Sequence, residues 1–278
     1  MSLKADLHTH TNYSDGVLSP FELLDLAKTK DISIISITDH DTVDGIESAI
    51  DYAKNLNIEV IPGVEISSDI DGSEVHFLGY FIDYKNTELN KYLKFFRDER
   101  LERAKRIIKK LNKLGVSITI DDVLQISKNS PVCRPHIAKA ILLKGYVKMF
   151  TQAFQKFIGD NAPAFERKIY VAPQSALKII NDAGGLSFIA HPGFMEEDKL
   201  KKIIQLGVDG IEVVHSSHKP FQQKFYKGIV DQYCLLESGG SDFHGGMRND
   251  DANFGKFVVS SRVVKSIKKM ALSRFIED

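Results

Sequence analysis

Several features that would point directly to a function are scarce in this sequence. Two cysteines among 278 residues, Cys133 and Cys234, are too few for a disulfide framework, and neither has a C-x-x-C partner for a metal. Lysine plus arginine and aspartate plus glutamate number 37 each, so no net charge attracts nucleic acid or an anionic membrane to the surface as a whole. We therefore expect reduced thiols, and we expect a charged substrate to be held by a local group of side chains.

Long apolar runs and leader patterns are also missing. No stretch approaches the ~20 apolar residues of a membrane span, and the N-terminus shows no signal-peptide pattern. We expect a cytoplasmic protein that contacts no membrane. Nothing in the sequence indicates an obligate protein partner.

The chain has the alternating pattern of an α/β protein. Apolar β-type runs alternate with amphipathic helical segments, which is typical of a parallel sheet built from βα units. The predicted helices include 21–28, after Ser19 and Pro20 as N-cap and first residue, and also 42–55 and 173–183. Seven strands are predicted, at 4–8, 32–38, 58–62, 74–81, 186–190, 210–215 and 235–239.

The alternation breaks between residues 87 and 172. Apolar residues there recur every three or four positions from Leu89 to Leu114, which predicts a long helix ending at Gly115. Shorter helices are predicted at 121–127, 135–143 and 151–157, with Phe150, Phe154 and Phe157 in their core. We therefore expect a barrel formed by 1–86 and 173–278, with an all-helical insertion at 87–172.

Basic residues are frequent along the long helix of this insertion, from Arg97 to Lys113. Asp98, Glu99 and Glu102 interleave with them and allow pairing between neighbouring turns. A solvated helix face is favoured over a nucleic-acid-binding stripe, which stays open as the alternative.

Imidazole and carboxylate side chains cluster where the predicted strands end. His8 and His10 lie two residues apart in an extended segment, so both can reach one ion, and Asp242 and His244 repeat this spacing after the last strand. The candidate ligands are His8, His10, Asp15, His40, Glu65, His76, His191, Asp242 and His244. They exceed the three or four that one catalytic ion uses, so two or three divalent ions (Mn, Fe or Zn) sharing a carboxylate are predicted, with Glu65 as the bridge.

These residues carry a resemblance to a known family. Asp6-Leu7-His8-Thr9-His10, Thr38-Asp39-His40, Gly63-Val64-Glu65, His76, Ala190-His191-Pro192 and Gly240-Ser241-Asp242-Phe243-His244 match, in order, the motifs of the polymerase and histidinol phosphatase (PHP) superfamily of phosphoesterases. Within it, the chain most resembles the nucleoside 3′,5′-bisphosphate phosphatases and 5′-to-3′ exoribonucleases. That group carries an Arg-Pro-His-Ile-Ala type motif in its insertion, present here as Arg134 to Ala138, and a Gly-Val-Glu-Ile-Ser segment, present as Gly63 to Ser67.

The resemblance implies a distorted (β/α)₇ barrel that holds three ions. The first would be bound by His8, His10, Glu65 and Asp242, the second by Asp15, His40 and His244, and the third by Glu65, His76 and His191. Asp6 and Asp39 would orient ligand histidines. Clustered divalent ions lower the pKa of a bridging water, align a phosphate ester for in-line attack and offset charge on the leaving oxygen. No nucleophilic side chain is required.

Four further residues are candidates for the substrate. Arg134 and His136 are expected on a substrate phosphate, because guanidinium matches phosphate oxygens, although Arg134-Pro135 is also a common helix start. Arg248 is a candidate for a second phosphate, with a solvated surface role as the alternative. His215, at the end of the sixth strand, is either a proton donor to the leaving group or a structural histidine.

The predicted function is metal-dependent hydrolysis of phosphate esters in small phosphorylated nucleotides or at the 5′ ends of short RNA. One alternative is a phosphomonoesterase for a non-nucleotide such as histidinol phosphate. Another is a non-catalytic, metal-stabilised interaction module. The complete set of ligand types argues against the module, and the insertion with Arg134 and His136 argues against the non-nucleotide substrate.

Overall fold

The apolar runs form one curved sheet that nearly closes into a barrel. The computed structural model describes residues 3–277 except 129, 170, 194 and 247. Strand order in the sheet is β7-β6-β5-β4-β3-β2-β1-β8. The strands are β1 (Lys4–Thr9), β2 (Ile32–Ile37), β3 (Glu59–Ile70), β4 (Ser73–Tyr80), β5 (Leu186–Ile189), β6 (Gly210–Val214), β7 (Leu236–Gly239) and β8 (Val259–Ser260). The expected α/β barrel is confirmed.

Backbone hydrogen bonds join the first strand to the segment after the last parallel strand. The Asp242 N–H donates to the His8 carbonyl at 2.9 Å, and the His10 N–H donates to the Phe243 carbonyl at 2.9 Å. The two ends of the sheet therefore meet at His8 and Asp242.

The sheet is less regular than a parallel barrel, and the predicted third strand was too short. β3 runs on to Ile70 and pairs antiparallel with β4, which is also antiparallel to β5. The hairpin turns at Asp71 and Gly72, which have φ of 52° and 80°, the left-handed values of a two-residue turn. Polar Ser67 and Ser68 resemble loop residues in sequence, but both are buried within β3.

A short eighth strand was not predicted. β8 contributes two residues, Val259 and Ser260, antiparallel to Ala5 and Lys4 at the edge of the sheet. A run of this length carries too few residues for a period of two to be recognised.

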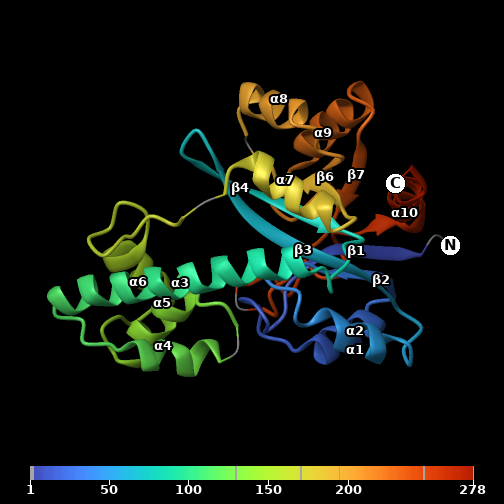
Figure 1. Cartoon of the computed structure of the whole chain (residues 1–278). Coiled ribbons are helices and arrows are strands. Elements are labelled where there is room, and N and C mark those ends of the chain that lie inside the picture. Colours follow the sequence, from blue (N-terminus) through green and yellow to red (C-terminus); the bar gives the residue numbers. More distant parts are fainter. Residues whose placement is uncertain (1–2, 129, 170, 194, 247, 278) are drawn as a thin grey trace.

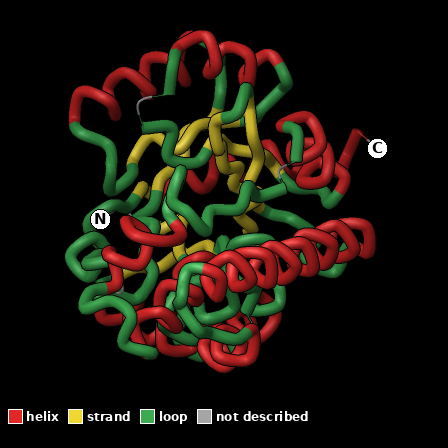
Figure 2. The backbone as a smooth tube through the Cα atoms, turned by 90° about the vertical axis from the view of Figure 1, so that its left-hand side faces the viewer, coloured by secondary structure: helices red, strands yellow, loops and turns green. Residues whose placement is uncertain are grey.

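Helices cover the outside of the curved sheet on two sides. In Figure 1, α1 (Pro20–Thr29) and α2 (Ile46–Ala53) lie on one side, and α7 (Pro173–Asp182), α8 (Glu197–Gln205) and α9 (Pro220–Gln232) lie on the other. α10 (Ser261–Glu277) follows β8, and Figure 2 shows the strands inside this shell of helices. Ser19 caps α1 as predicted, whereas α2 begins four residues later than expected, after turns that follow His40. None of the helices in the described part of the chain is long and apolar enough to cross a membrane.

The helical insertion (87–172) projects from the barrel in Figure 1. It contains α3 (Thr87–Lys113), α4 (Ile120–Ser127), α5 (Arg134–Leu143), α6 (Phe150–Ala153) and the π-helical turn η1 (Phe154–Ile158). Most of its apolar residues form a cluster of their own, but Leu89 and Leu93 at the start of α3 belong to a barrel cluster. The first turns of α3 therefore anchor the insertion, and we keep 87–172 as proposed boundaries.

Candidate metal centre and substrate cavity

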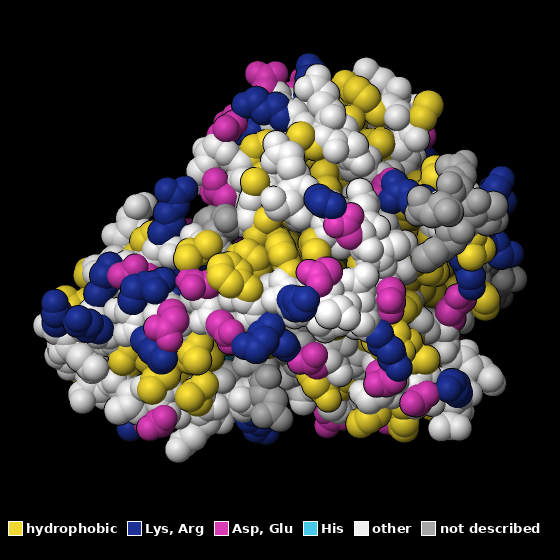
Figure 3. Space-filling model, viewed as in Figure 1, with side chains coloured by type: hydrophobic (Ala, Val, Ile, Leu, Met, Phe, Trp, Pro, Cys, Tyr) yellow, Lys and Arg dark blue, Asp and Glu magenta, His cyan; other side chains and the backbone are white. Residues whose placement is uncertain are grey.

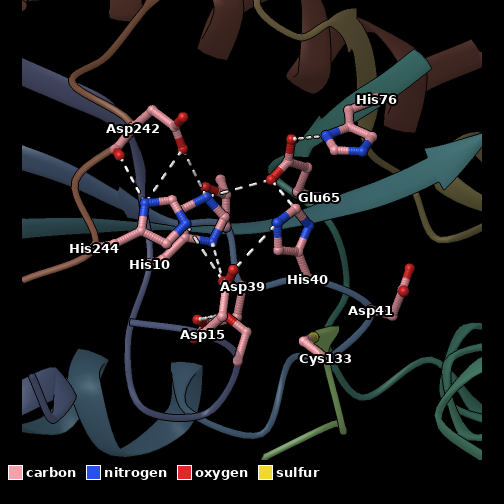
Figure 4. Close-up of polar contacts among 12 residues, drawn as sticks. His10, Asp15, Asp39, His40, Asp41, Glu65, His76, Cys133, Asp242 and His244 are labelled. Atoms are coloured by element: carbon pink, nitrogen blue, oxygen red, sulfur yellow. Dashed lines mark hydrogen bonds and ion pairs between the residues drawn. The ribbon is translucent and has the colours of Figure 1, made fainter. Parts of the chain in front are cut away.

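The candidate ligands gather at one edge of the barrel. His8 lies in β1 and His10 just beyond it, while His40, His191 and Asp242 follow β2, β5 and β7. The carboxyl ends of parallel strands meet at this edge. His76 reaches the same edge from the beginning of β4 because that strand is antiparallel. Figure 4 shows the side chains converging there.

Glu65 lies at the centre of the group. It sits in the middle of β3, not just beyond a strand as predicted. Its Oε1 is 2.8 Å from His76 Nδ1 and 3.1 Å from His191 Nε2. Its Oε2 lies 3.4, 3.2 and 3.1 Å from ring nitrogens of His8, His10 and His40, respectively. One carboxylate thus faces five imidazoles, which is the arrangement that a bridging ligand requires.

The ligand atoms fall into overlapping groups whose members lie within 4.8 Å of one another. These are His10, Asp15, His40 and His244; His8, His10 and Asp242; His40, Glu65 and His76; and His8, Glu65 and His191. A further group joins His8 to Glu212 and His215. Each of the nine candidate ligands therefore belongs to at least one group whose atoms are close enough to share an ion. His10 belongs to two of these groups.

Unpaired buried atoms show that this group is built for cations. Among the side chains that the structure describes, buried atoms without a hydrogen-bond partner include His8 Nε2, both ring nitrogens of His10, His40 Nδ1, Asp15 Oδ1, Glu65 Oε2 and His244 Nε2. Buried polar atoms are normally satisfied, and leaving one unpaired costs ~1–3 kcal/mol. Imidazole nitrogen and carboxylate oxygen are donors that suit Mn, Fe and Zn. The residues present therefore fit divalent metal.

Electrostatics within the group favour ionised carboxylates. Burial opposes ionisation of Glu65, but His40, His76 and His8 hold its pKa well below the ordinary value. Burial also lowers the pKa of His10, yet the nearby carboxylates of Asp242 and Glu65 raise it to about 9. His40 has a pKa of about 3, because burial outweighs its carboxylate neighbours. Without metal the group holds protonated and neutral imidazoles side by side, and metal binding would displace the protons.

Glu212, which sequence reasoning missed, orients two of the histidines. Its Oε1 accepts a hydrogen bond from His8 Nδ1 at 2.9 Å, so His8 presents Nε2 to the centre. Its Oε2 accepts from the His191 backbone N–H at 2.6 Å. Asp6, expected to orient a ring, instead accepts from the backbone N–H groups of His8 and Ser241. The sequence signal for Glu212 was its position as the one acidic residue inside the apolar run of β6.

A cavity of about 420 Å³ opens from the metal centre toward the insertion. Asp15, His40 and His76 line its inner end. Five cationic side chains also line it: Arg100, Arg103, Arg134, Lys168 and Arg248. An anion in this cavity would lie between the candidate metal ligands and these cations.

The structure gives different surroundings to the three residues expected to contact substrate phosphates, Arg134, Arg248 and His136. Arg134 lines the cavity and donates to Asp160 Oδ1 at 2.7 Å. Arg248 also lines it, but its Nη2 donates to Asp15 Oδ2 at 2.5 Å, so it holds a candidate metal ligand as well. His136 is buried, and its Nδ1 accepts from the Cys133 N–H, capping α5. Its imidazole thus has a role at the start of the helix.

His215 lies behind the candidate ligands. It is buried, and its Nε2 is 3.5 Å from Asp242 Oδ2 while Nδ1 contacts Ser217 Oγ at 2.8 Å. Its imidazole also packs near the rings of His8 and His191. The position places His215 against Asp242, and its role as proton donor stays a prediction.

Sequence reasoning missed three of the five cavity cations. Arg100 donates through two nitrogens to Asp41 Oδ2 and through Nη1 to Cys133 Sγ at 3.2 Å. Arg103 is buried, and its Nε donates to the Glu166 carbonyl at 2.8 Å. Lys168 lies on the return from the insertion to the barrel.

Several other charges of α3 do face solvent. Lys94 pairs with Asp98, and Lys105 with Glu102, on exposed positions. Figure 3 shows Lys and Arg side chains interspersed with acidic ones on this side of the molecule. A solvated face therefore describes these residues but not Arg100 and Arg103.

The fold and the site define a class of protein, a hydrolase that acts on phosphate esters and has ligands for divalent metal. Comparisons with known proteins agree with this class. A 5′-3′ exoribonuclease of Haemophilus influenzae is 33% identical over 88% of this chain and 91% of its own length. A 3′,5′-nucleoside bisphosphate phosphatase of Chromobacterium violaceum is 31% identical over 86% of each chain. A solved structure from Bifidobacterium adolescentis, described as a metal-dependent phosphoesterase, has a TM-score of 0.86 at 28% identity, covering 95% of this chain and 94% of that one.

The PHP domain model matches residues 6–176. This chain belongs to the PHP domain family. The match spans both the first part of the barrel and the helical insertion, and the relatives extend the similarity over most of the remaining chain.

Proposed function

We propose that this protein hydrolyses phosphate esters of nucleotides, either nucleoside 3′,5′-bisphosphates or the 5′ ends of short RNA. One observation carries the proposal: the cavity runs without interruption from the candidate metal ligands to a group of cations contributed largely by the insertion. A substrate with phosphates at two places would contact both ends of such a cavity. The names of the two relatives, an exoribonuclease and a bisphosphate phosphatase, fit this charge pattern.

We assign two or three divalent ions, Mn, Fe or Zn, to the ligand group. His8, His10, Glu65 and Asp242 would hold the first; Asp15, His40 and His244 the second; and Glu65, His76 and His191 the third. Glu65 would bridge, which its contacts with five imidazoles support. Because His10 is also grouped with Asp15, His40 and His244, it is the residue that would link the first two sites.

The bound ions would supply an activated water and charge neutralisation at the scissile phosphate. The protein's own residues divide the remaining work. Arg134 would hold the phosphate remote from the metals, and Arg248 would hold both Asp15 and substrate oxygen, since it lines the cavity while bonded to that carboxylate. His136 would fix the start of α5 and thereby the direction of Arg134. His215 would act through Asp242 or as the proton donor, and the pH profile of a His215→Gln variant would separate these roles.

The test is metal reconstitution followed by a substrate panel. The protein, stripped with chelator and reloaded separately with Mn, Fe or Zn, is analysed for metal content and assayed on adenosine 3′,5′-bisphosphate, a 5′-phosphorylated oligoribonucleotide and histidinol phosphate. We expect at least two ions per chain and hydrolysis of one or both nucleotide substrates. At most one ion after loading would overturn the multinuclear assignment. Preference for histidinol phosphate would overturn the nucleotide assignment, and metal binding without any hydrolysis would favour a non-catalytic module.

A further inference from the structure

The cavity next to the metal centre has two chemically different parts. Barrel residues, α3 and the return segment contribute imidazole, carboxylate, guanidinium and ammonium groups. The apolar lining residues of the cavity are Pro135, Phe150 and Phe154, at the start of α5 and on the α6–η1 segment, next to Arg134. A mononucleotide has the same division, with charged phosphates joined through ribose to a flat aromatic base.

Phe150 and Phe154 are placed as a surface for a flat ligand. Their ring centroids are 5.5 Å apart and the rings are tilted by 58°, so they form a phenyl wall on which a flat ligand can stack on one ring and contact the other with its edge. Both rings are partly buried and pack against the apolar cluster of the insertion, as predicted, and they also line the cavity. Phe157 packs against the same apolar cluster but does not line the cavity. Of Phe150, Phe154 and Phe157, the first two therefore face the charged cavity.

The local backbone connects this wall to the candidate phosphate-binding residue. α6 passes into a π-helical turn at Phe154, where the Gly159 N–H donates to the Phe154 carbonyl at 2.9 Å. Single π-helical turns are frequent at functional sites. Asp160 follows this turn and accepts the Arg134 hydrogen bond. The phenyl wall and Arg134 are therefore held in one unit, at the side of the cavity formed by the insertion.

We infer that Phe150 and Phe154 form a stacking platform for the nucleobase of the substrate, with Pro135 beside it. This inference rests on the proposed function, because only a nucleotide substrate brings a base to the cavity. Phenyl and pyrrolidine side chains have no hydrogen-bonding atoms. Stacking on them is sequence-tolerant because every base has a π-face. The platform therefore selects nucleotides over other phosphate esters without selecting among bases.

The experiment compares a nucleotide with the same molecule without its base. The metal-loaded protein and its Phe154→Leu and Phe150→Leu variants are assayed on adenosine 3′,5′-bisphosphate and on 1-deoxyribose 3,5-bisphosphate. The variant that removes the stacked ring should lower kcat/KM for the nucleotide by roughly 5- to 150-fold, the value of one base–aromatic stack, and the other variant should lower it less. For the base-free substrate the change should stay within about twofold. Phe157→Leu is the matched control, because it removes the same atoms from the same cluster outside the cavity, and it should change neither ratio.

Several results would overturn the platform. These are equal turnover of both substrates by the wild type, an equal loss of activity on both substrates in a Phe150 or Phe154 variant, and the same selective loss in Phe157→Leu. Rates on the adenosine, guanosine, cytidine and uridine bisphosphates should agree within about tenfold, and a larger preference for one base would also contradict an apolar platform. Failure of the proposed function itself looks different, because then the wild type hydrolyses neither bisphosphate. Circular dichroism and unfolding midpoints identify variants that fail to fold, for which Phe150→Met and Phe154→Met serve as second substitutions.

Discussion

The barrel and the helical insertion meet at one cavity but contribute to it differently. The barrel supplies short side chains with few rotatable bonds, such as Asp15, His40 and His76, from its strands and the loops that follow them. The insertion supplies long side chains and phenyl rings from helices that pack in an apolar cluster of their own. Metal coordination requires donor atoms placed to within a few tenths of an ångström, which hydrogen-bonded strand edges provide.

The difference implies a division between chemistry and recognition. A change in the barrel ligands should affect every substrate, because each substrate needs the same metal centre. A change in the insertion should affect substrates according to the groups they carry. The following predictions separate the two regions by the size and the selectivity of the loss.

The largest effect is expected at the centre of the barrel site. Glu65→Gln keeps the shape of the side chain but removes the charge that five imidazoles face. Neighbouring ions then repel one another without a shared anion, so we expect lower metal occupancy and at least ~100-fold loss of activity on all substrates. Elemental analysis and steady-state kinetics check this. Full metal content with near-normal turnover would rule out the bridge.

The contact between the insertion and the barrel can be tested by substituting Arg100. Its guanidinium pairs with Asp41, next to His40, and the side-chain exposures of the two are 9% and 3%. Arg100→Met leaves a buried carboxylate unpaired, which typically costs ~3–5 kcal/mol in unfolding free energy. The double variant Arg100→Met/Asp41→Asn should recover part of the lost unfolding free energy, because it removes the unpaired charge.

Arg97→Met is the matched control on the same helix. Arg97 pairs with Asp44, whose side chain is 47% exposed, so we expect a loss below about 1 kcal/mol. Denaturant unfolding of the metal-loaded proteins measures both. Equal losses for Arg97 and Arg100 would show that the Arg100 pair does not anchor the insertion.

Substitution of Arg134 tests whether the insertion recognises a second phosphate on the substrate. If Arg134 binds a phosphate remote from the metals, Arg134→Ala should lower kcat/KM by roughly 10- to 150-fold for bisphosphates and leave a simple aryl phosphate nearly unchanged. Metal content should stay the same. Arg167→Ala is a control, because Arg167 is exposed in the same insertion and lies outside the cavity lining. A uniform loss on both substrates would place Arg134 at the reacting phosphate instead.

The smallest effect in the barrel is expected from Glu212, which orients ligands without lining the cavity. Glu212→Gln weakens its hold on His8 Nδ1 and the His191 backbone, and we expect ~10- to 100-fold weaker metal affinity. Added metal should recover most of the activity. Glu237 on the adjacent strand forms an ion pair with Lys227 at the surface, so Glu237→Gln should change neither quantity. Activity that stays lost at saturating metal would assign Glu212 a more direct role.

The sequence carried most of the information about the barrel, because strand ends and ligand types are local features. His8 and His10 follow an apolar run, and Asp242 and His244 follow another, so their meeting follows from parallel strands sharing an edge. The β3–β4 hairpin was misread although Asp71-Gly72 is a strong turn signal, because buried Ser67 and Ser68 interrupted the expected apolar pattern. The tertiary structure buries Ser67 and Ser68, and β3 therefore extends beyond its predicted end.

The insertion side of the cavity was harder to predict. Arg100 and Arg103 occupy the positions where the apolar stripe of α3 would continue between Phe96 and Ile107, but the many basic neighbours obscured this irregularity. Lys168 lies in an irregular segment, and only the return of the chain from the insertion brings it to the cavity. Such contacts depend on how two packed regions are placed, which no local pattern encodes.

The hydrogen bonds between His8 and Asp242 also bear on how the protein acquires its metal in a cell. At ~5–20 residues per second, ribosomal synthesis separates the appearance of these two residues by roughly 10 to 50 s. Throughout that interval the early histidines lack the carboxylate from the far end of the sheet, so the growing chain offers only partial coordination. The full donor set arises when the last parallel strand docks beside the first. The candidate site is therefore a property of the finished fold, because only the complete sheet brings Asp242 beside His8.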